Sequence, residues 1–170
     1  NGVASGFITI ASFALTISLI ILQNYEIAIA TLCLAFASLA FYKYHKLPSR
    51  IFPGDSGALT FGATYGVIAI VGHVEVIAAI AILPAIINSF LFLSSVKKIV
   101  EHRETKNPVS HTDDFKLKTG DYKNAPITLV RLIIAKRPLS EKQIVTEIFR
   151  LGIFSGVLAI ITAFLMGVEV

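Results

Sequence analysis

The sequence predicts an all-α polytopic membrane protein of about five spanning helices, with a small cytoplasmic appendage that holds a short strand or hairpin. The chain of 170 residues is 55% hydrophobic and only 15% charged, whereas a soluble domain has about 25% charged residues. Its apolar residues form long runs, each close to the roughly 20 residues that a spanning helix needs. Its Lys and Arg residues fall in only two of the segments between these runs. A nucleic-acid partner is not expected.

Five apolar runs define the predicted spans: Val3–Leu22, Ile27–Tyr42, Gly57–Gly72, Val76–Val96 and Leu151–Val168. If the N-terminus is cytoplasmic, all fifteen Lys and Arg residues lie inside, in segments 43–56 and 97–150. The connections "QNYE" and "GHVE" and the final "GVEV" then lie outside and carry none. This asymmetry follows the positive-inside rule and supports the number of spans.

The chain divides into three predicted parts. Residues 1–100 form a membrane bundle of four spans with a cytoplasmic loop around Asp55, residues 101–149 form the cytoplasmic appendage, and residues 150–170 form the last span. The first residues, "NGVASGF", include no initiating Met. We therefore expect a fragment of a longer protein that forms one larger domain.

The predicted appendage contains three local patterns. "DDFKLKTGDY" alternates polar and apolar residues and predicts a short strand or hairpin. "APITLVRLIIA" predicts a short helix that lies on the membrane or against the bundle. Ser140 followed by Gln143 predicts a capping box. The helix that this box starts is expected to continue into the last span.

Two pairs of glycines are spaced four residues apart inside predicted spans, Gly62 with Gly66 and Gly152 with Gly156. This spacing places both glycines of a pair on one helix face and is typical of close helix packing. We expect packing at both pairs, with a path for a substrate as the alternative.

Pro84 and Asn88 also lie four residues apart within a predicted span. Proline removes a backbone hydrogen bond within a helix, and a polar side chain at membrane depth faces the bundle interior. Asn88 is therefore expected to form a hydrogen bond between helices, with a catalytic role as the alternative.

The segment "FPGDSG" leaves one carboxylate, Asp55, between a basic stretch and an apolar run. Mg²⁺ prefers one or two carboxylates together with water and phosphate oxygens, and a helix start favours anions. A lone Asp at this place is equally explained as an N-cap. His102 and Arg103 fit phosphate binding, or a basic membrane anchor together with Lys97 and Lys98.

"FPGDSGALTFGATYGVIAIVGH" resembles the polyprenyl-phosphate N-acetylhexosamine-1-phosphate transferase family, which is glycosyltransferase family 4. Within it, the chain is similar to the UDP-N-acetylglucosamine–dolichyl-phosphate N-acetylglucosaminephosphotransferases. The shared features include the Phe-x-Gly-Asp loop, an Asn at position 88 and a His-Arg pair at 102–103. "KLKTG" and "NGVASG" also fit family segments. The resemblance covers nearly the whole chain and corresponds to the C-terminal half of such an enzyme.

The resemblance implies that N-acetylglucosamine 1-phosphate moves from UDP-N-acetylglucosamine to a polyprenyl (dolichyl) phosphate, with release of UMP. This is the first step of lipid-linked oligosaccharide synthesis for N-glycosylation. The implied site residues are, as catalytic groups, Asp55, His102 and Arg103 and, as substrate-binding groups, Asn1, Gly2, Phe52, Gly54 and Asn88.

Individual roles also follow from the resemblance. Asp55 would bind Mg²⁺ on the diphosphate and Phe52 would stack on the uracil, while the opening Asn-Gly pair would line the nucleoside pocket. Arg103 would hold the diphosphate or the sugar, and His102 the sugar. The active site would be cytoplasmic, in an archaeal plasma membrane or in an endoplasmic reticulum membrane, and a homodimer is left open.

Some family features are absent from this sequence. Glu101 stands where the family has Arg, and the bacterial His-rich loop motif is missing, which argues against the peptidoglycan-precursor branch. The family's Asp-Asp pair belongs to the half that this chain lacks, so Asp113 and Asp114 are interpreted as solvated loop acids. Two other classes stay open: part of a membrane transporter or channel, and a non-catalytic membrane subunit.

Overall fold

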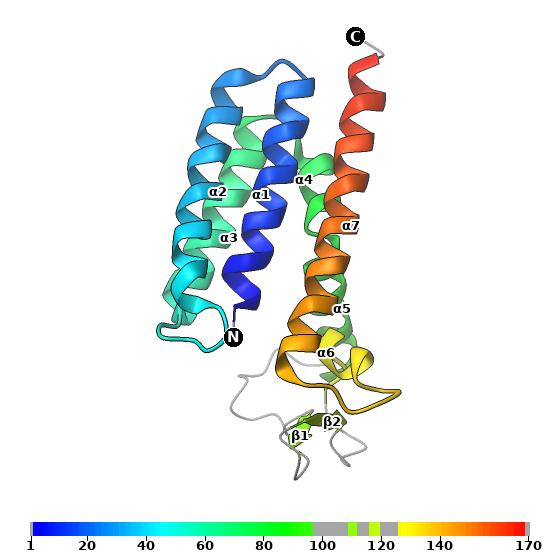
Figure 1. Cartoon of the computed structure of the whole chain (residues 1–170). Helices are drawn as coiled ribbons and strands as arrows, with labels where there is room; N and C mark the ends of the chain where they lie inside the picture. The colour runs from blue at the N-terminus through cyan, green and yellow to red at the C-terminus, as the bar shows by residue number, and fades with distance from the viewer. Residues whose placement is uncertain (1, 97–108, 112–115, 120–125, 169–170) are drawn as a thin grey trace. The chain divides into compact units, whose positions relative to one another are not determined.

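The computed structural model describes residues 2–96, 109–111, 116–119 and 126–168 (Figure 1). These residues form two compact units, Asn1–Leu83 with Ile148–Val170, called the bundle unit, and Pro84–Glu147, called the second unit. The elements are α1 (Val3–Ile21), α2 (Tyr25–His45), α3 (Gly54–Val71), α4 (Glu75–Ala81), α5 (Leu83–Val96), β1 (Val109–His111), β2 (Leu117–Thr119), α6 (Leu129–Ile133) and α7 (Glu141–Val168).

The predicted class, an all-α polytopic membrane protein, is confirmed. Among the described residues, α1, α2 and α7 are each long and apolar enough to cross a membrane, and α4 with α5 together form either one broken span or a re-entrant loop. Helix α3 is not among them, although it has 18 residues. Its first turn, "GDSG", is polar and lowers its average hydropathy. The predicted number of five spans is therefore not confirmed.

The predicted span Val76–Val96 is divided in the structure. Helix α4 ends at Ala81 and α5 begins at Leu83, so Ile82 stands between them. Pro84 follows directly and is buried. Its ring lacks an N–H group and collides with the carbonyl four residues earlier, which explains why one continuous helix does not form here.

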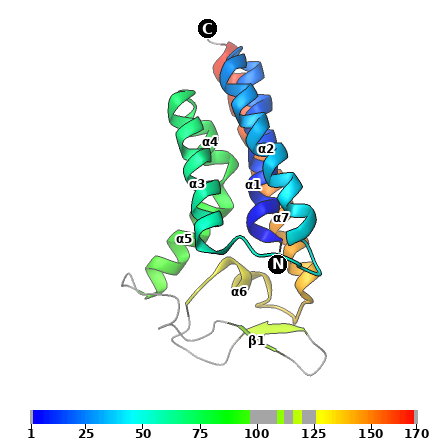
Figure 2. The same cartoon turned by 90° about the vertical axis from the view of Figure 1, so that its left-hand side faces the viewer.

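Helix α1 is the central element of the bundle unit, packed against α2, α3 and α4. Its side chains Leu15 and Leu19 are fully buried, as is Ile77 of α4. Helix α3 is tied to α4 by the Tyr65 hydroxyl, which donates to the Ala78 carbonyl oxygen at 3.1 Å. Figure 2 shows α3 beside α4, with α1 and α2 next to them.

Helices α1 and α2 also share hydrogen bonds between small polar side chains, here called the polar seam. Thr9 Oγ1 donates to Ser38 Oγ at 2.9 Å, and Ser5 Oγ lies 2.8 Å from His45 Nδ1. All four side chains are buried. Small residues with interhelical hydrogen bonds are typical of helix pairs within membranes.

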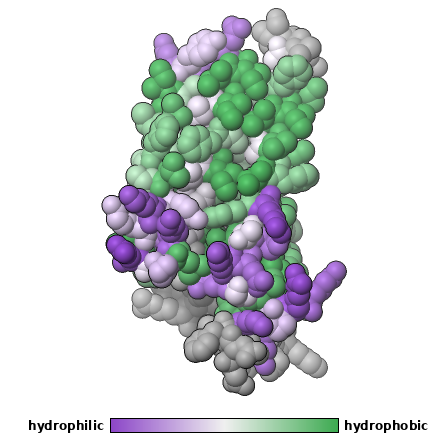
Figure 3. Space-filling view, in the orientation of Figure 1, coloured by the Kyte–Doolittle hydropathy of each residue, from purple (hydrophilic) through white to green (hydrophobic). Residues whose placement is uncertain are grey.

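Two of the predicted outside segments, the α1–α2 and α3–α4 turns, lie together at one end of the bundle unit. The α1–α2 and α3–α4 turns each contain a residue with positive φ, Gln23 at 59° and His73 at 54°. Asn24 Nδ2 donates to the Gly72 carbonyl oxygen at 3.4 Å and so joins the two turns. On the face shown in Figure 3, apolar side chains cover the helices, and polar ones gather where the α2–α3 loop lies.

The two glycine pairs differ. A Cβ atom on Gly152 would lie 3.1 Å from the Phe7 ring, and one on Gly156 would lie 3.0 Å from the Ala14 side chain, so α7 packs closely on α1 as predicted. A Cβ on Gly62 or Gly66 would meet no described atom within 4 Å. The close packing predicted for Gly62 and Gly66 is therefore not found among the described residues.

The second unit confirms the local predictions for the appendage. Strands β1 and β2 pair antiparallel, with Ser110 opposite Lys118, and the short helix α6 forms after them. Ser140 N–H donates to Gln143 Oε1 at 2.9 Å, and Gln143 N–H donates to Ser140 Oγ at 3.4 Å, which is the predicted capping box. Helix α7 then continues without a break into the last span.

Candidate functional site

The loop between α2 and α3 carries three of the predicted site residues, Phe52, Gly54 and Asp55. Gly54 has φ 60°, in the left-handed region that favours glycine. The chain turns here into α3, whose N-cap residue is Pro53 and whose first turn contains Asp55. The alternative interpretation of Asp55 as the N-cap is therefore wrong, because Asp55 lies inside the helix.

The carboxylate of Asp55 is available to a ligand. The residue is exposed, and its side chain forms no hydrogen bond or ion pair with another described residue. The N–H groups at a helix start also favour anions. Asp55 therefore lies where a carboxylate and free backbone donors can meet an anionic ligand together with its counter-ion.

Asp55 can supply one ligand of a magnesium ion, but not a complete site. No group of three or more His, Cys, Asp or Glu side chains suited to a metal occurs among the described residues. Mg²⁺ takes one or two carboxylates and completes its octahedron with water and phosphate oxygens. A single exposed carboxylate therefore fits this ion when a diphosphate supplies further oxygens.

Phe52 lies against a histidine that the sequence analysis did not select. Its ring centroid is 5.9 Å from that of His45, with the ring planes at 72°. The Phe52 side chain is 67% exposed, whereas His45 is only 4% exposed and is held by Ser5 in the polar seam. An aromatic ring that packs against one neighbour and stays largely exposed can stack on a planar ligand.

Gly2 lies beside the same end of α2 as His45. It is the N-cap of α1, with φ 80°. A Cβ on Gly2 would lie 3.2 Å from the Tyr42 ring, 3.3 Å from Lys46 Cα and 3.7 Å from the His45 carbonyl oxygen. The structure thus brings Gly2 and Phe52, both predicted to bind the nucleoside, to the same residue at the end of α2.

Asn88 lies in the second unit and is partly buried. Its Oδ1 accepts a hydrogen bond of 2.8 Å from the backbone N–H of Leu129, the first residue of α6. The predicted hydrogen bond between helices is confirmed, and it satisfies one of the free N–H groups at the start of α6. Its role in substrate binding stays a prediction.

The remaining predicted positions lie outside the described residues. They are Asn1, His102, Arg103 and the acidic pair Asp113 and Asp114. Their predicted roles, including the use of His102 and Arg103 as catalytic groups, therefore stay predictions.

The chain resembles known proteins in the part that holds the Gly2–His45–Phe52 cluster. Residues 1–73 match the family model of Glycosyl transferase family 4. The three residues of the cluster, and Asp55, fall within this matched segment. The family match therefore covers α1, α2, the loop and α3, which are the elements that build the cluster.

Curated relatives extend the similarity over nearly the whole chain. The "Putative glycosyltransferase" of Methanocaldococcus jannaschii is 32% identical over 162 residues, which is 95% of this chain and 52% of that protein. The phospho-N-acetylmuramoyl-pentapeptide-transferase of Staphylococcus aureus strain JH9 is 28% identical over 162 residues, 94% of this chain and 44% of that protein.

A shorter match is to the phospho-N-acetylmuramoyl-pentapeptide-transferase of Clostridium beijerinckii. It is 42% identical over 53 residues, 31% of this chain and 16% of that protein. The chain spans about half the length of the curated relatives that it matches along nearly its whole length.

Proposed function

We propose that this chain is part of a membrane-embedded sugar-1-phosphate transferase of Glycosyl transferase family 4, and that its α2–α3 loop binds the nucleotide of the donor. The observation that carries the proposal is the cluster at the end of α2. There Phe52 and Gly2 both adjoin the buried His45, and Asp55 follows in the first turn of α3. The cluster lies inside the segment that matches the family.

The proposed reaction moves N-acetylglucosamine 1-phosphate from UDP-N-acetylglucosamine to a polyprenyl (dolichyl) phosphate. An oxygen of the lipid phosphate attacks the sugar-linked phosphorus, the bond to the UMP oxygen breaks, and UMP leaves. Phosphoryl transfer of this kind depends on positioning and on neutralising charge. Mg²⁺, when bound, would supply part of that neutralisation.

Each described residue has a distinct role in this proposal. Phe52 stacks on the uracil, since its side chain is largely exposed, and base stacking on an aromatic side chain is worth about 1–3 kcal/mol. Asp55 would hold Mg²⁺. His45 is a positioning residue, because it packs against the Phe52 ring and is itself fixed by Ser5.

Arg103 and His102 complete the proposal, with Arg103 on the diphosphate and His102 on the sugar. A planar guanidinium suits a diphosphate because it offers paired N–H donors. The proposal that Arg103 and His102 act at the same site as Asp55 rests on the resemblance of the sequence to the family.

The choice of N-acetylglucosamine over a muramoyl-pentapeptide donor rests on the sequence, which lacks the His-rich motif of the bacterial branch. Relatives named for phospho-N-acetylmuramoyl-pentapeptide transfer make this choice worth testing directly. Membranes that contain the intact protein should transfer label from UDP-N-acetylglucosamine and not from the muramoyl-pentapeptide donor. Transfer from the muramoyl-pentapeptide donor alone would support the proposed transferase activity but contradict the proposed choice of N-acetylglucosamine.

The decisive variant is Asp55→Asn in the intact protein, assayed with labelled UDP-N-acetylglucosamine and polyprenyl phosphate. We expect transfer to fall by about 100-fold or more, the size of effect seen when one group that stabilises charge is removed from a site. Glu75→Gln is the matched control, because Glu75 is also an exposed carboxylate in the first turn of a helix. Near-normal transfer by Asp55→Asn at saturating Mg²⁺ would overturn the proposal.

A further inference from the structure

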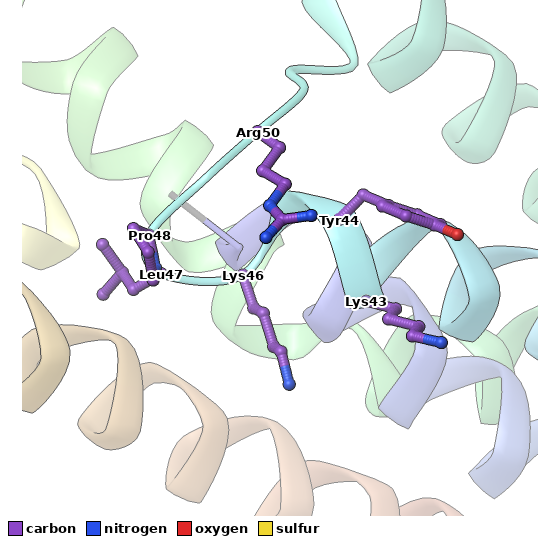
Figure 4. A pocket seen from close by; sticks show the side chains of 6 residues that line it. All are labelled: Lys43, Tyr44, Lys46, Leu47, Pro48 and Arg50. Atoms are coloured by element: carbon purple, nitrogen blue, oxygen red, sulfur yellow. The ribbon is translucent and has the colours of Figure 1, made fainter.

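The last turn of α2 and the loop after it form a cleft, and three of its six lining residues are cationic. The cleft has a volume of about 270 Å³, and its lining residues are Lys43, Tyr44, Lys46, Leu47, Pro48 and Arg50 (Figure 4). Figure 4 shows the Arg50 side chain extending from the loop toward the last turn of α2, where Lys43 and Lys46 begin. The backbone N–H of Arg50 donates to the Tyr44 carbonyl oxygen at 2.9 Å, which fixes the loop against the helix.

A second, more open cleft adjoins the first along α2. It has a volume of about 490 Å³, and its lining residues are Phe36, Leu39, Ala40, Tyr42, Lys43 and Lys46. The two clefts share Lys43 and Lys46. Together they form a continuous surface that is cationic at the end of the helix and apolar over the two preceding turns, here called the α2 groove.

Most of the α2 groove lies on the side of α2 that faces away from His45, while its inner edge, at Tyr42 and Lys46, adjoins Gly2. Successive residues of a helix are turned by about 100°, so Lys43 and His45 point roughly 200° apart. His45 is buried and directed toward Ser5 of α1, whereas Phe36, Ala40 and Lys43 are exposed. A chain that lies along Phe36 and Ala40 would therefore extend over the outer side of α2.

The cations of the groove have no acidic partner in the described part of the chain. No Asp or Glu lines either cleft, and Lys43, Lys46 and Arg50 form no ion pair with a described residue. Three positive charges that line one cleft attract an anion. Arg offers a planar set of donors that suits a phosphate, and Lys adds point charges.

We propose that the α2 groove binds an anionic phospholipid of the surrounding bilayer. Its phosphate would lie between Lys43, Lys46 and Arg50, and one acyl chain would lie along Phe36, Leu39 and Ala40. A free phosphate would leave the apolar part of the groove without a ligand. The polyprenyl phosphate acceptor has to reach the donor near Asp55, whereas the apolar part of the groove, at Phe36 and Ala40, lies on the exposed outer side of α2. A bilayer phospholipid fits both the charge and the orientation.

The test uses the intact protein in vesicles of phosphatidylcholine with a minor fraction of phosphatidylglycerol. Gentle extraction is followed by native mass spectrometry, which counts the phosphatidylglycerol molecules that stay bound. We expect the triple variant Lys43→Gln, Lys46→Gln, Arg50→Gln to retain at least about tenfold less of this lipid, because each basic residue near the membrane contributes to the attraction.

The matched control is Lys136→Gln, Arg137→Gln, Lys142→Gln, which removes the same charge at exposed positions of the second unit. We expect it to change lipid retention by less than about twofold, since none of these three residues lines either cleft. Equal losses in the two triple variants would overturn the proposal, because retention would then depend on net charge alone.

A second variant tests the apolar half and does not depend on the triple variant folding. Ala40→Trp keeps all three cations and fills the groove, so retention of phosphatidylglycerol should fall by several-fold. Unchanged retention, together with displacement of the lipid by inorganic phosphate, would show a simple anion site and overturn the proposal. Preferred binding of polyprenyl phosphate in place of phosphatidylglycerol would also overturn it. The readout is lipid retention, so failure here leaves the proposed transferase activity untouched.

Discussion

Helices α3 and α7 both carry glycines four residues apart, but only α7 uses them for packing. On α7, Gly152 and Gly156 face Phe7 and Ala14 of α1 at distances that leave no room for a side chain. On α3, Gly62 and Gly66 face no described atom within 4 Å. The same spacing thus accompanies a closed helix contact in one place and an open face in the other, because the spacing alone does not specify a partner.

The open face belongs to the helix that begins with the candidate site. Asp55 lies in the first turn of α3, while α7 takes no part in the Gly2–His45–Phe52 cluster. We therefore expect substitutions on the α7 contact to change stability, and substitutions in the α2–α3 loop to change ligand binding with little change in stability.

The largest effect is expected for Gly156→Leu. The added side chain would collide with Ala14, whose Cβ lies 3.0 Å from the position of the new Cβ. Overpacking of this kind lowers the free energy of unfolding by about 2–3 kcal/mol. Unfolding of the protein in mixed detergent, followed by circular dichroism, measures the change. Gly62→Leu is the matched control and should change it by less than about 0.5 kcal/mol; an equal loss in both would contradict the comparison.

The second-largest effect is expected on the binding of the donor nucleotide sugar. Phe52→Ala should weaken the affinity for UDP-N-acetylglucosamine by about tenfold or more, because a stacking ring is removed. The ring is 67% exposed, so the free energy of unfolding should hardly change. Isothermal titration calorimetry measures the affinity, and Phe52→Tyr, which keeps the ring, should restore most of it. A loss of stability without a loss of affinity would assign Phe52 a structural role.

A smaller effect is expected for Gly152→Ala. The new methyl group would lie 3.1 Å from the Phe7 ring, which can move by a few tenths of an ångström. We expect a loss of about 1 kcal/mol in the free energy of unfolding. The double variant with Phe7→Leu should recover part of this loss in the same detergent assay. No recovery would mean that the strain is not at this contact.

The smallest effect is expected for Gly62→Ala. Alanine favours a helix over glycine, and the new methyl group meets no described atom. The variant should be more stable by about 0.5 kcal/mol, since alanine restricts the unfolded chain. The detergent assay measures this gain. A clear loss would show that α3 is packed as closely as α7 and would remove the difference between the two helices.

The sequence predicted best those features that depend on neighbours along the chain. The capping box needs only Ser140 and Gln143, which are three residues apart, and it formed as expected. A helix start near Asp55 was also expected, although Asp55 lies inside the helix and is not its N-cap. The number of spans was harder to predict, because α3 begins with a polar turn and Pro84 divides another apolar run into two helices.

Features that depend on distant contacts were missed. The segment "KYHKLP" by itself does not predict that His45 packs against Phe52. The position of His45 depends on Ser5, which is 40 residues away in the chain. The signal that could have found it is a histidine at the end of an apolar helix, next to a predicted binding loop. For the same reason, the packing of Gly62 could not be predicted without knowing what faces α3.

The polar seam also determines how far α1 and α2 can slide along each other. Water is scarce between helices in a membrane, so Ser5–His45 and Thr9–Ser38 find few substitute partners. A displacement of α2 by one turn would break both pairs at once. The height of the Phe52 ring along the bundle is therefore determined by two buried hydroxyl contacts between neighbouring helices, independently of any ligand.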